Sequence, residues 1–280
     1  MLISTAQLAD RLSDPNWVIF DCRHDLMDHA KGAQLYQAGH IPGANFAPVE
    51  TALAGTKTGV NGRHPLPAPE AFAAFLSAHG VSDATTVVVY DDSGGLYAAR
   101  LWWMARWIGL KSVALLDGGI PRWIAEGRPI ATDLPAPRTA HLTARVNPAM
   151  AWDTATVLNH LSDPSSAIID ARAAERFRGD VETIDPVAGH IPGALNRFYK
   201  ANLKADLTFR PAAELKREFS ELLTNRSPEK VVHQCGSGIT ACANIFAMEY
   251  AGLPGSKLYP GSWSEWIADP ARPVARGASN

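Results

Sequence analysis

The residue most suited to chemistry is Cys235, in the segment VVHQCGSGITACANI (231–245). It follows an apolar run and opens a turn whose glycines free the backbone for unusual dihedral angles, so that N–H groups can converge. A helix expected to begin near Thr240 adds the positive end of its dipole. Cys235 is therefore expected to be a thiolate nucleophile at neutral pH. The residues expected to surround it and its substrate are Gly236, Gly238, Ile239 and Thr240.

Cys22 and Cys242 are the other two cysteines of the chain. An odd and sparse set of this kind is not a disulfide framework, and it contains no CxxC pair or Cys/His spacing typical of zinc. We therefore expect a reducing, cytoplasmic location and no metal. Cys22 lacks a glycine-rich turn and Cys242 falls inside the expected helix, so both are interpreted as structural.

The composition excludes several classes of function. The chain has 280 residues, of which 46% are hydrophobic and 19% charged, and its formal net charge is −2. A near-neutral charge provides no footprint for nucleic acid or an anionic membrane. No apolar run approaches the roughly 20 residues of a membrane span, and the N-terminus lacks the pattern of a signal peptide. A protein of about two ordinary domains is expected.

An internal repeat organises the chain. GHIPG occurs at 39–43 and again at 189–193, and the segment 87–103 matches 231–247 with Asp92 opposite Cys235. The order of these features is the same in both halves, which indicates a duplication. We predict an N-terminal domain at 1–135, a Pro-rich linker at 136–149 and a C-terminal domain at 150–280. The first domain lacks the thiol, so it is expected to be catalytically inactive.

Short apolar strands alternate with helices in each half, which predicts an α/β fold with a small parallel sheet covered on both faces. Catalytic groups then collect at the carboxyl ends of the strands, where Cys235 lies. The expected strands are 17–21, 86–91, 113–118, 167–171, 230–234 and 256–261, and the expected helices are 5–12, 68–79, 97–109, 120–126, 153–161, 211–223, 240–251 and 263–268.

The paired GHIPGA motifs and the loop CGSGITA (235–241) resemble the two-domain rhodanese-type sulfurtransferases over essentially the whole chain. The loop is similar to that of the 3-mercaptopyruvate sulfurtransferase branch, whereas thiosulfate enzymes carry a more basic loop. The resemblance implies two tandem rhodanese-like domains and no cofactor. It also implies that Cys235 takes a sulfane sulfur from a small anionic donor as a persulfide and passes it to a thiol, thioredoxin or cyanide.

The resemblance also implies further site residues. Ser237 would act with a histidine and an aspartate, for which the matching positions are His40 and Asp28. The segment ERFRG points to Arg176 as the cation that binds the donor. The second arginine that is usual in the branch is absent from 180–190. The residues that could replace it are Arg197, Arg63 and His64.

Three other interpretations remain. A thiosulfate:cyanide sulfurtransferase would use the same cysteine. A cysteine phosphatase would need an arginine six positions after the cysteine, where this chain has Ala241, so phosphoryl chemistry is disfavoured. A non-catalytic binding module would fit the first half alone. His190 and Trp266 are expected to be structural, and Trp263 is expected to lie near the loop.

Overall fold

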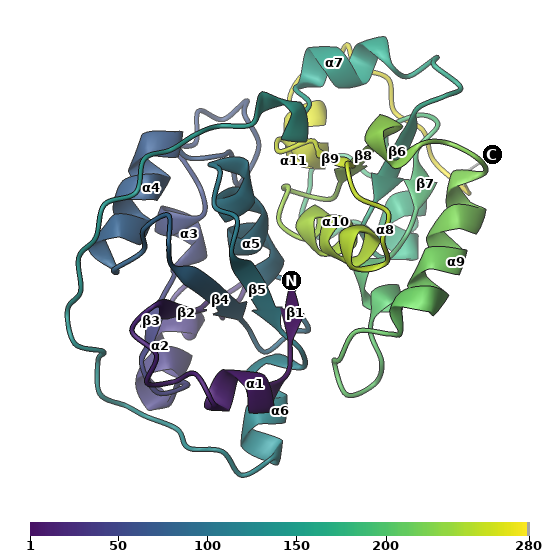
Figure 1. The fold of residues 1–280 in the computed structure, drawn as a ribbon. Coiled ribbons are helices and arrows are strands. Elements are labelled where there is room, and N and C mark those ends of the chain that lie inside the picture. Colours follow the sequence, from purple (N-terminus) through teal and green to yellow (C-terminus); the bar gives the residue numbers. More distant parts are fainter. Residues whose placement is uncertain (279–280) are drawn as a thin grey trace. The chain divides into compact units, whose positions relative to one another are not determined.

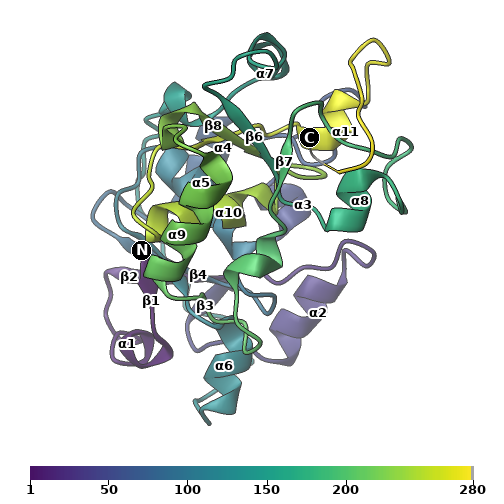
Figure 2. The same cartoon turned by 90° about the vertical axis from the view of Figure 1, so that its right-hand side faces the viewer.

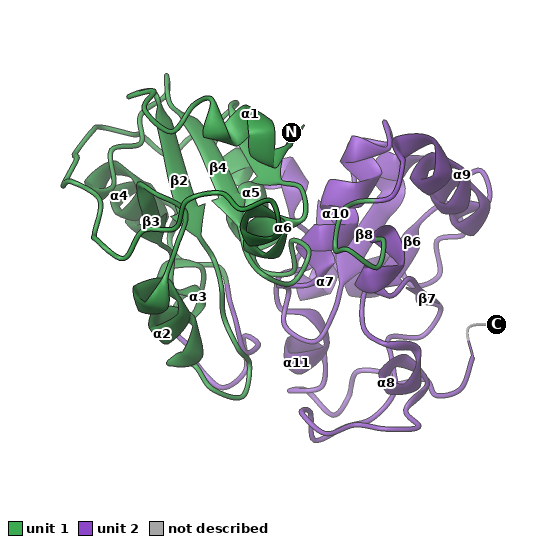
Figure 3. Ribbon diagram, turned by 90° about the horizontal axis from the view of Figure 1, so that it is seen from below, with its two compact units in different colours: residues 1–55, 66–147, 204–209 green, residues 56–65, 148–203, 210–280 purple. Residues whose placement is uncertain are grey.

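The computed structural model describes residues 1–278 and divides them into two compact units (Figure 3). Each unit includes a short segment from the other half of the sequence, which the repeat, with its expected linker at 136–149, did not predict. Unit 1 comprises Met1–Gly55, Leu66–Asn147 and Lys204–Phe209; unit 2 comprises Thr56–Pro65, Pro148–Leu203 and Arg210 onward.

Unit 1 contains a five-stranded parallel sheet with the strand order β1-β5-β4-β2-β3 (Figure 1). Its central strands are buried, as their continuous apolar runs predict. The strands are β1 (Leu2–Ile3), β2 (Trp17–Asp21), β3 (Ala44–Phe46), β4 (Thr86–Tyr90) and β5 (Val113–Leu116); the helices are α1 (Thr5–Ala9), α2 (Lys31–Ala38), α3 (Val49–Ala52), α4 (Pro69–Ala78), α5 (Ala98–Trp107) and α6 (Gly119–Ala125).

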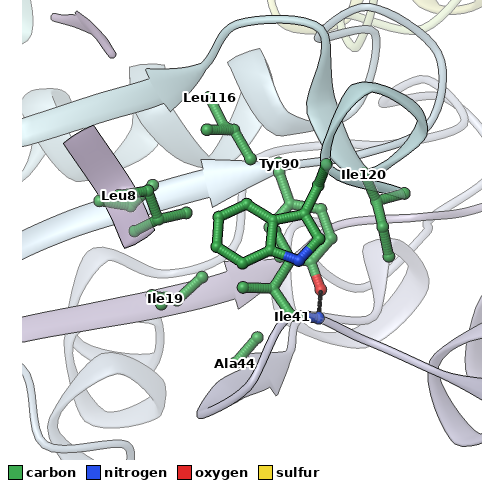
Figure 4. Packing of buried hydrophobic residues seen from close by; sticks show 9 residues of the cluster. Leu8, Ile19, Ile41, Ala44, Tyr90, Leu116 and Ile120 are labelled. Carbon is green, nitrogen blue, oxygen red and sulfur yellow. Dashed lines mark hydrogen bonds between the residues drawn. The ribbon is translucent and has the colours of Figure 1, made fainter. Parts of the chain in front are cut away.

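The core of unit 1 joins side chains from β2, β4 and β5 to those of α1 and α6 (Figure 4). Leu8, Ile19 and Leu116 pack together in this cluster. The hydroxyl of Tyr90 accepts a hydrogen bond from the Ile41 N–H at 3.2 Å, so the one polar atom of this ring is satisfied. The core thereby fixes the first GHIPG motif against the end of β4.

Unit 2 contains a four-stranded parallel sheet with the order β7-β6-β8-β9, and α9 and α10 lie in contact beside it (Figure 2). The strands are β6 (Ala167–Asp170), β7 (Leu195–Asn196), β8 (Val231–Gln234) and β9 (Lys257–Leu258). The helices are α7 (Thr154–Asn159), α8 (Ala174–Arg178), α9 (Ala212–Leu223), α10 (Ala241–Tyr250) and α11 (Ser262–Trp266), with 3₁₀ turns at Pro148–Met150, Tyr199–Asn202 and Pro228–Lys230. No helix in the described part of the chain is long and apolar enough to span a membrane.

Each unit contains an equivalent buried Arg–Asp ion pair that binds its GHIPG motif. Arg23 pairs with Asp21 at the end of β2 and donates to the carbonyl of Gly39 at 2.7 Å. Arg172 pairs with Asp170 at the end of β6 and donates to the carbonyl of Gly189 at 2.8 Å. Each pair ties its GHIPG motif to the carboxyl edge of its own sheet, so the motif is a structural feature of both units.

Candidate active site

The loop that carries Cys235 joins β8 to α10 in unit 2. The Gly238 N–H donates to Sγ of Cys235 at 3.2 Å. The Cys235 N–H donates to Oγ of Ser262 at 3.2 Å, and its carbonyl accepts from the Trp263 N–H at 3.0 Å. The cysteine is 1% exposed. The backbone therefore holds the thiol in one orientation, with an N–H group directed at the sulfur.

Two serines of α11 complete this support, and the sequence did not identify either. Ser262 has φ of 53°, unusual for a residue with a side chain, and its hydroxyl donates to the Tyr259 carbonyl at 2.9 Å. The Ser264 N–H donates to the Gly236 carbonyl at 3.0 Å. The first residues of α11 thus hold both Cys235 and Gly236 in place.

Two guanidinium groups approach the loop on the side of Gly236 where another residue would carry its side chain. A Cβ atom at Gly236 would lie 2.7 Å from Nη2 of Arg63 and 3.8 Å from Nη2 of Arg176. Glycine at this position therefore leaves room for Arg63. Burial lowers the pKa of Arg63, whereas the charge of the Cys235 thiolate acts in the opposite direction. Of the two arginines considered as replacements for the second cation, Arg63 is the one that lies at Gly236.

Two buried carboxylates face these cations. Asp185 forms an ion pair with Arg63 and lies 3.1 Å from Nη2 of Arg176. Glu182 lies 2.9 Å from the same Nη2 and accepts the N–H groups of Ile184 and Asp185. The side chains of Glu182 and Asp185 are only 3% and 1% exposed. These carboxylates therefore balance much of the positive charge of Arg63 and Arg176. The only sign of them in the sequence was the acidic character of 180–185.

Ser237 forms its hydrogen bond with His64, since Oγ lies 2.8 Å from Nδ1 of the imidazole. Both residues are buried, and the segment Thr56–Pro65 belongs to unit 2. The expectation that Ser237 pairs with His40 is corrected in this respect. The chain positions 64 and 237 come together because the Arg63 N–H donates to Oγ of Ser264 at 3.0 Å, which ties this segment to α11.

His40 has a structural environment, which the sequence analysis expected only for its counterpart His190. Nδ1 of His40 lies 2.8 Å from the Tyr36 carbonyl, Nε2 lies 3.1 Å from the Asp133 carbonyl, and the ring stacks on Tyr36. Nδ1 of His190 lies 2.8 Å from the Phe177 carbonyl, and the ring stacks on Phe177. Both histidines are therefore held by backbone carbonyls inside their own units.

The other predicted residues are placed as follows. Asp28 is exposed in unit 1, where its Oδ1 accepts the Ala30 N–H at 3.1 Å. Arg197 pairs with Glu218 at 2.7 Å and lies over the ring of Phe219. These bonds direct Arg197 toward α9. Ile239 and Thr240 complete the loop, and Thr240 directly precedes α10.

The equivalent loop of unit 1 already contains an anion. Both Tyr90 and Gln234 end their strands, opposite Asp21 and Asp170 respectively, so the residue equivalent to Cys235 is Asp91. The predicted alignment of Asp92 with Cys235 is thereby corrected, because the unit 1 loop is one residue longer. The carboxylate of Asp91 accepts four backbone N–H groups at 2.8–2.9 Å, from Ser93, Gly95, Tyr97 and Ala98.

Asp91 shows what this type of loop binds. A cluster of N–H groups from the loop and the first turn of α5 converges on one negative group. In unit 2 the Gly238 N–H makes the corresponding contact with Sγ of Cys235. The loop architecture of both units therefore favours an anion, and unit 1 supplies that anion from its own side chain.

Cys22 and Cys242 are fully buried. Burial raises the pKa of the Cys22 thiol, which makes it a poor nucleophile. The thiol of Cys242 donates to the Gly238 carbonyl at 3.5 Å. Trp263 and Trp266 are also fully buried, and their indole N–H groups donate to the carbonyls of Val187 and Pro273.

Comparison with known proteins gives consistent matches over the full length. The model of the rhodanese-like domain matches residues 4–126 and 153–269. A probable 3-mercaptopyruvate sulfurtransferase of Pseudomonas aeruginosa is 47% identical, with 99% of this chain and 98% of the relative covered. A putative thiosulfate sulfurtransferase of Mycobacterium tuberculosis is 37% identical, with 100% and 98% covered.

Comparison with solved structures points to the same family. A 3-mercaptopyruvate sulfurtransferase from Leishmania major superposes with a TM-score of 0.84 at 30% identity, covering 95% of this chain and 74% of that chain. Each unit of the present chain contains a parallel sheet, and one of the two family matches covers most of each unit. The chain therefore belongs to the rhodanese family and contains two rhodanese-like domains.

Proposed function

We propose that the chain is a sulfurtransferase that takes the sulfur of 3-mercaptopyruvate onto Cys235 and passes it to a thiol or cyanide. One arrangement carries the proposal. The Sγ atom of Cys235 accepts the Gly238 N–H, while the guanidinium groups of Arg63 and Arg176 approach Gly236 beside it. A nucleophile, a donor for its negative charge and cations for a donor carboxylate thus occur together.

The reaction has two steps. The thiolate of Cys235 attacks the donor sulfur, the C–S bond breaks, and its electron pair leaves with the pyruvate enolate, which takes a proton. Cys235 is then a persulfide. In the second step an acceptor thiolate or cyanide attacks the outer sulfur, the S–S bond breaks, and the Cys235 thiolate is restored. Ser237, hydrogen-bonded to His64, is a suitable donor of the proton to the enolate.

The charge balance favours a donor with one negative charge. Glu182 and Asp185 already pair with Arg176, and Asp185 also pairs with Arg63. A dianion such as thiosulfate would be repelled by these buried carboxylates more strongly than the monocarboxylate of 3-mercaptopyruvate. We infer that the donor carboxylate binds Arg176 and Arg63 in exchange with Asp185.

The test is a comparison of kcat/KM for 3-mercaptopyruvate and thiosulfate, measured with cyanide and with a small thiol as acceptors. A higher value for 3-mercaptopyruvate is expected. A higher value for thiosulfate would favour the second candidate, thiosulfate sulfurtransferase, for which the relative from Mycobacterium tuberculosis is named. The acceptor in the cell, including thioredoxin, and a cytoplasmic location stay predictions.

Arg176→Ala is expected to raise KM for 3-mercaptopyruvate by roughly ten- to a hundredfold, because a charge-assisted hydrogen bond contributes about 1.5–3 kcal/mol. The value of kcat should change less. The matched control is Arg178→Ala in the same helix, since the Arg178 side chain is 41% exposed and pairs with Asp180. Steady-state kinetics on both variants check the prediction, and equal KM values would contradict it.

Ser237→Ala is expected to lower kcat/KM for 3-mercaptopyruvate by roughly 10²–10⁴-fold, the range for loss of a proton donor. Turnover of thiosulfate should fall much less, because sulfite leaves without needing a proton. His64→Ala should reproduce this selective loss, whereas His40→Ala should lower the stability of unit 1. A parallel loss with both donors would show that Ser237 only supports the loop.

A further inference from the structure

The loop after β2 brings two histidines of unit 1 against one glutamate. Nε2 of His24 lies 3.8 Å from Oε1 of Glu50, and Nε2 of His29 lies 3.9 Å from the same oxygen. All three donor atoms lie within 4.8 Å of one another. None of these residues takes part in the proposed sulfur transfer. Glu50 is in the short helix α3, so segments separate in the sequence converge here.

Neighbouring contacts hold the loop in this shape. Oδ1 of Asp25 accepts the N–H groups of Met27 and Asp28 at 2.7 and 3.1 Å, which turns the chain back toward His24. The imidazole of His24 meets the ring of Tyr97 edge-on at 5.1 Å and lies 5.4 Å from that of His29. The His24 side chain is 4% exposed, while that of His29 is 55% exposed. The buried imidazole of His24 is therefore held in place by its packing, whereas that of His29 is accessible to solvent.

We propose that His24, His29 and Glu50 form a binding site for a divalent metal ion of the zinc type. Two imidazoles and one carboxylate form a donor set that Zn²⁺ and its neighbours in the transition series prefer, whereas Mg²⁺ and Ca²⁺ prefer oxygen. Zinc bonds of about 2.0–2.1 Å in tetrahedral geometry place ligand atoms roughly 3.3 Å apart. The two histidine–glutamate separations are about half an ångström longer than this, and the ring nitrogens of the two histidines lie within 4.8 Å of each other.

The charges around the site fit a cation. Glu50 supplies one negative charge, and the carboxylates of Asp25 and Asp28 lie in the same loop. Three protein ligands leave one tetrahedral position, and the exposure of His29 opens that position to water or a small ligand. Bound metal would join the loop after β2 to α3.

The experiment is titration of the metal-free full-length protein with Zn²⁺ by calorimetry, together with absorption spectra of the Co²⁺ form. One equivalent is expected to bind, and the Co²⁺ spectrum should lack a thiolate charge-transfer band. His29→Ala should weaken binding by roughly tenfold or more, since even loss of an outer-shell partner costs that much. Glu50→Gln should act in the same direction. Mg²⁺ should not compete.

Two controls separate this site from the rest of the chain. His141→Ala removes an exposed histidine, also of unit 1, and should leave the affinity unchanged. Cys235→Ser should retain the metal site, because the proposal involves no thiol. Binding that disappears in Cys235→Ser but persists in His29→Ala, or no stoichiometric binding at all, would overturn the proposal. Sulfur transfer by His29→Ala is an independent readout, which should be unchanged in metal-free buffer.

Discussion

Cys235→Ser is expected to lower sulfur transfer by at least about 10³-fold with every donor, because a serine hydroxyl is a poor nucleophile and cannot form the S–S bond of the intermediate. The folded structure should persist. Sγ of Cys235 accepts a hydrogen bond from the Gly238 N–H, and a serine hydroxyl oxygen can also accept this bond. Near-normal turnover would show that another group carries the sulfur.

Mass spectrometry gives the direct measurement of this intermediate. Treatment of the protein with 3-mercaptopyruvate in the absence of acceptor should add one sulfur atom, about 32 Da, to the peptide that contains Cys235. The matched control is Cys242→Ser, since Cys242 is a buried thiol in the helix that follows the same loop. It should retain both the added mass and the turnover. A persulfide found on Cys242 or Cys22 instead would refute the assignment.

Six strands were predictable because each is a short continuous apolar run that must be buried, whereas the short edge strands β1, β3 and β7 were not expected. The expected strand 17–21 is β2 (Trp17–Asp21), and the expected strand 230–234 is β8 (Val231–Gln234). Helix α2 (Lys31–Ala38) was not among the expected helices. It buries only Gly32 and Tyr36, and no side chain caps its N-terminus, so its sequence carries no apolar stripe or capping signal.

The partners of the cysteine loop were harder to predict than the loop itself. Glycines and a helix start indicate an anion site locally, but the pairing of His64 with Ser237 depends on the return of Thr56–Pro65 into unit 2. The repeated GHIPG motif drew attention to His40, whose imidazole is held by the carbonyls of Tyr36 and Asp133 inside unit 1. A repeated motif indicates a shared local structure, whereas a contact between segments distant in the sequence depends on tertiary packing.

The comparison of the two loops also supports the prediction that unit 1 is catalytically inactive. A carboxylate directed into four N–H groups occupies the position that a reactive anion would need. Burial raises the pKa of Asp91, and these N–H groups act against that shift. Duplication thus preserved the architecture of the loop in both units, while the identity of the residue after the strand decides whether a nucleophile is present.

Gly238→Ala is expected to damage both stability and turnover. Gly238 has φ of 80°, and an added Cβ would lie 2.3 Å from the Pro260 carbonyl oxygen. Left-handed backbone costs an alanine about 1–2 kcal/mol, and the steric overlap with backbone adds about 1–3 kcal/mol. The Gly238 N–H would also move away from Sγ of Cys235. A lower thermal unfolding temperature and a loss of kcat should therefore occur together.

Gly193→Ala is the matched control for the backbone conformation. Gly193 also belongs to unit 2, has φ of 76°, and would place its Cβ with nothing within 4 Å. It carries the cost of the left-handed backbone without the overlap, so it should unfold at a higher temperature than Gly238→Ala and retain its kcat. If the two variants behaved alike in calorimetry and kinetics, backbone conformation alone would account for the effect. The close approach of Pro260 would then have no part in holding the thiolate loop.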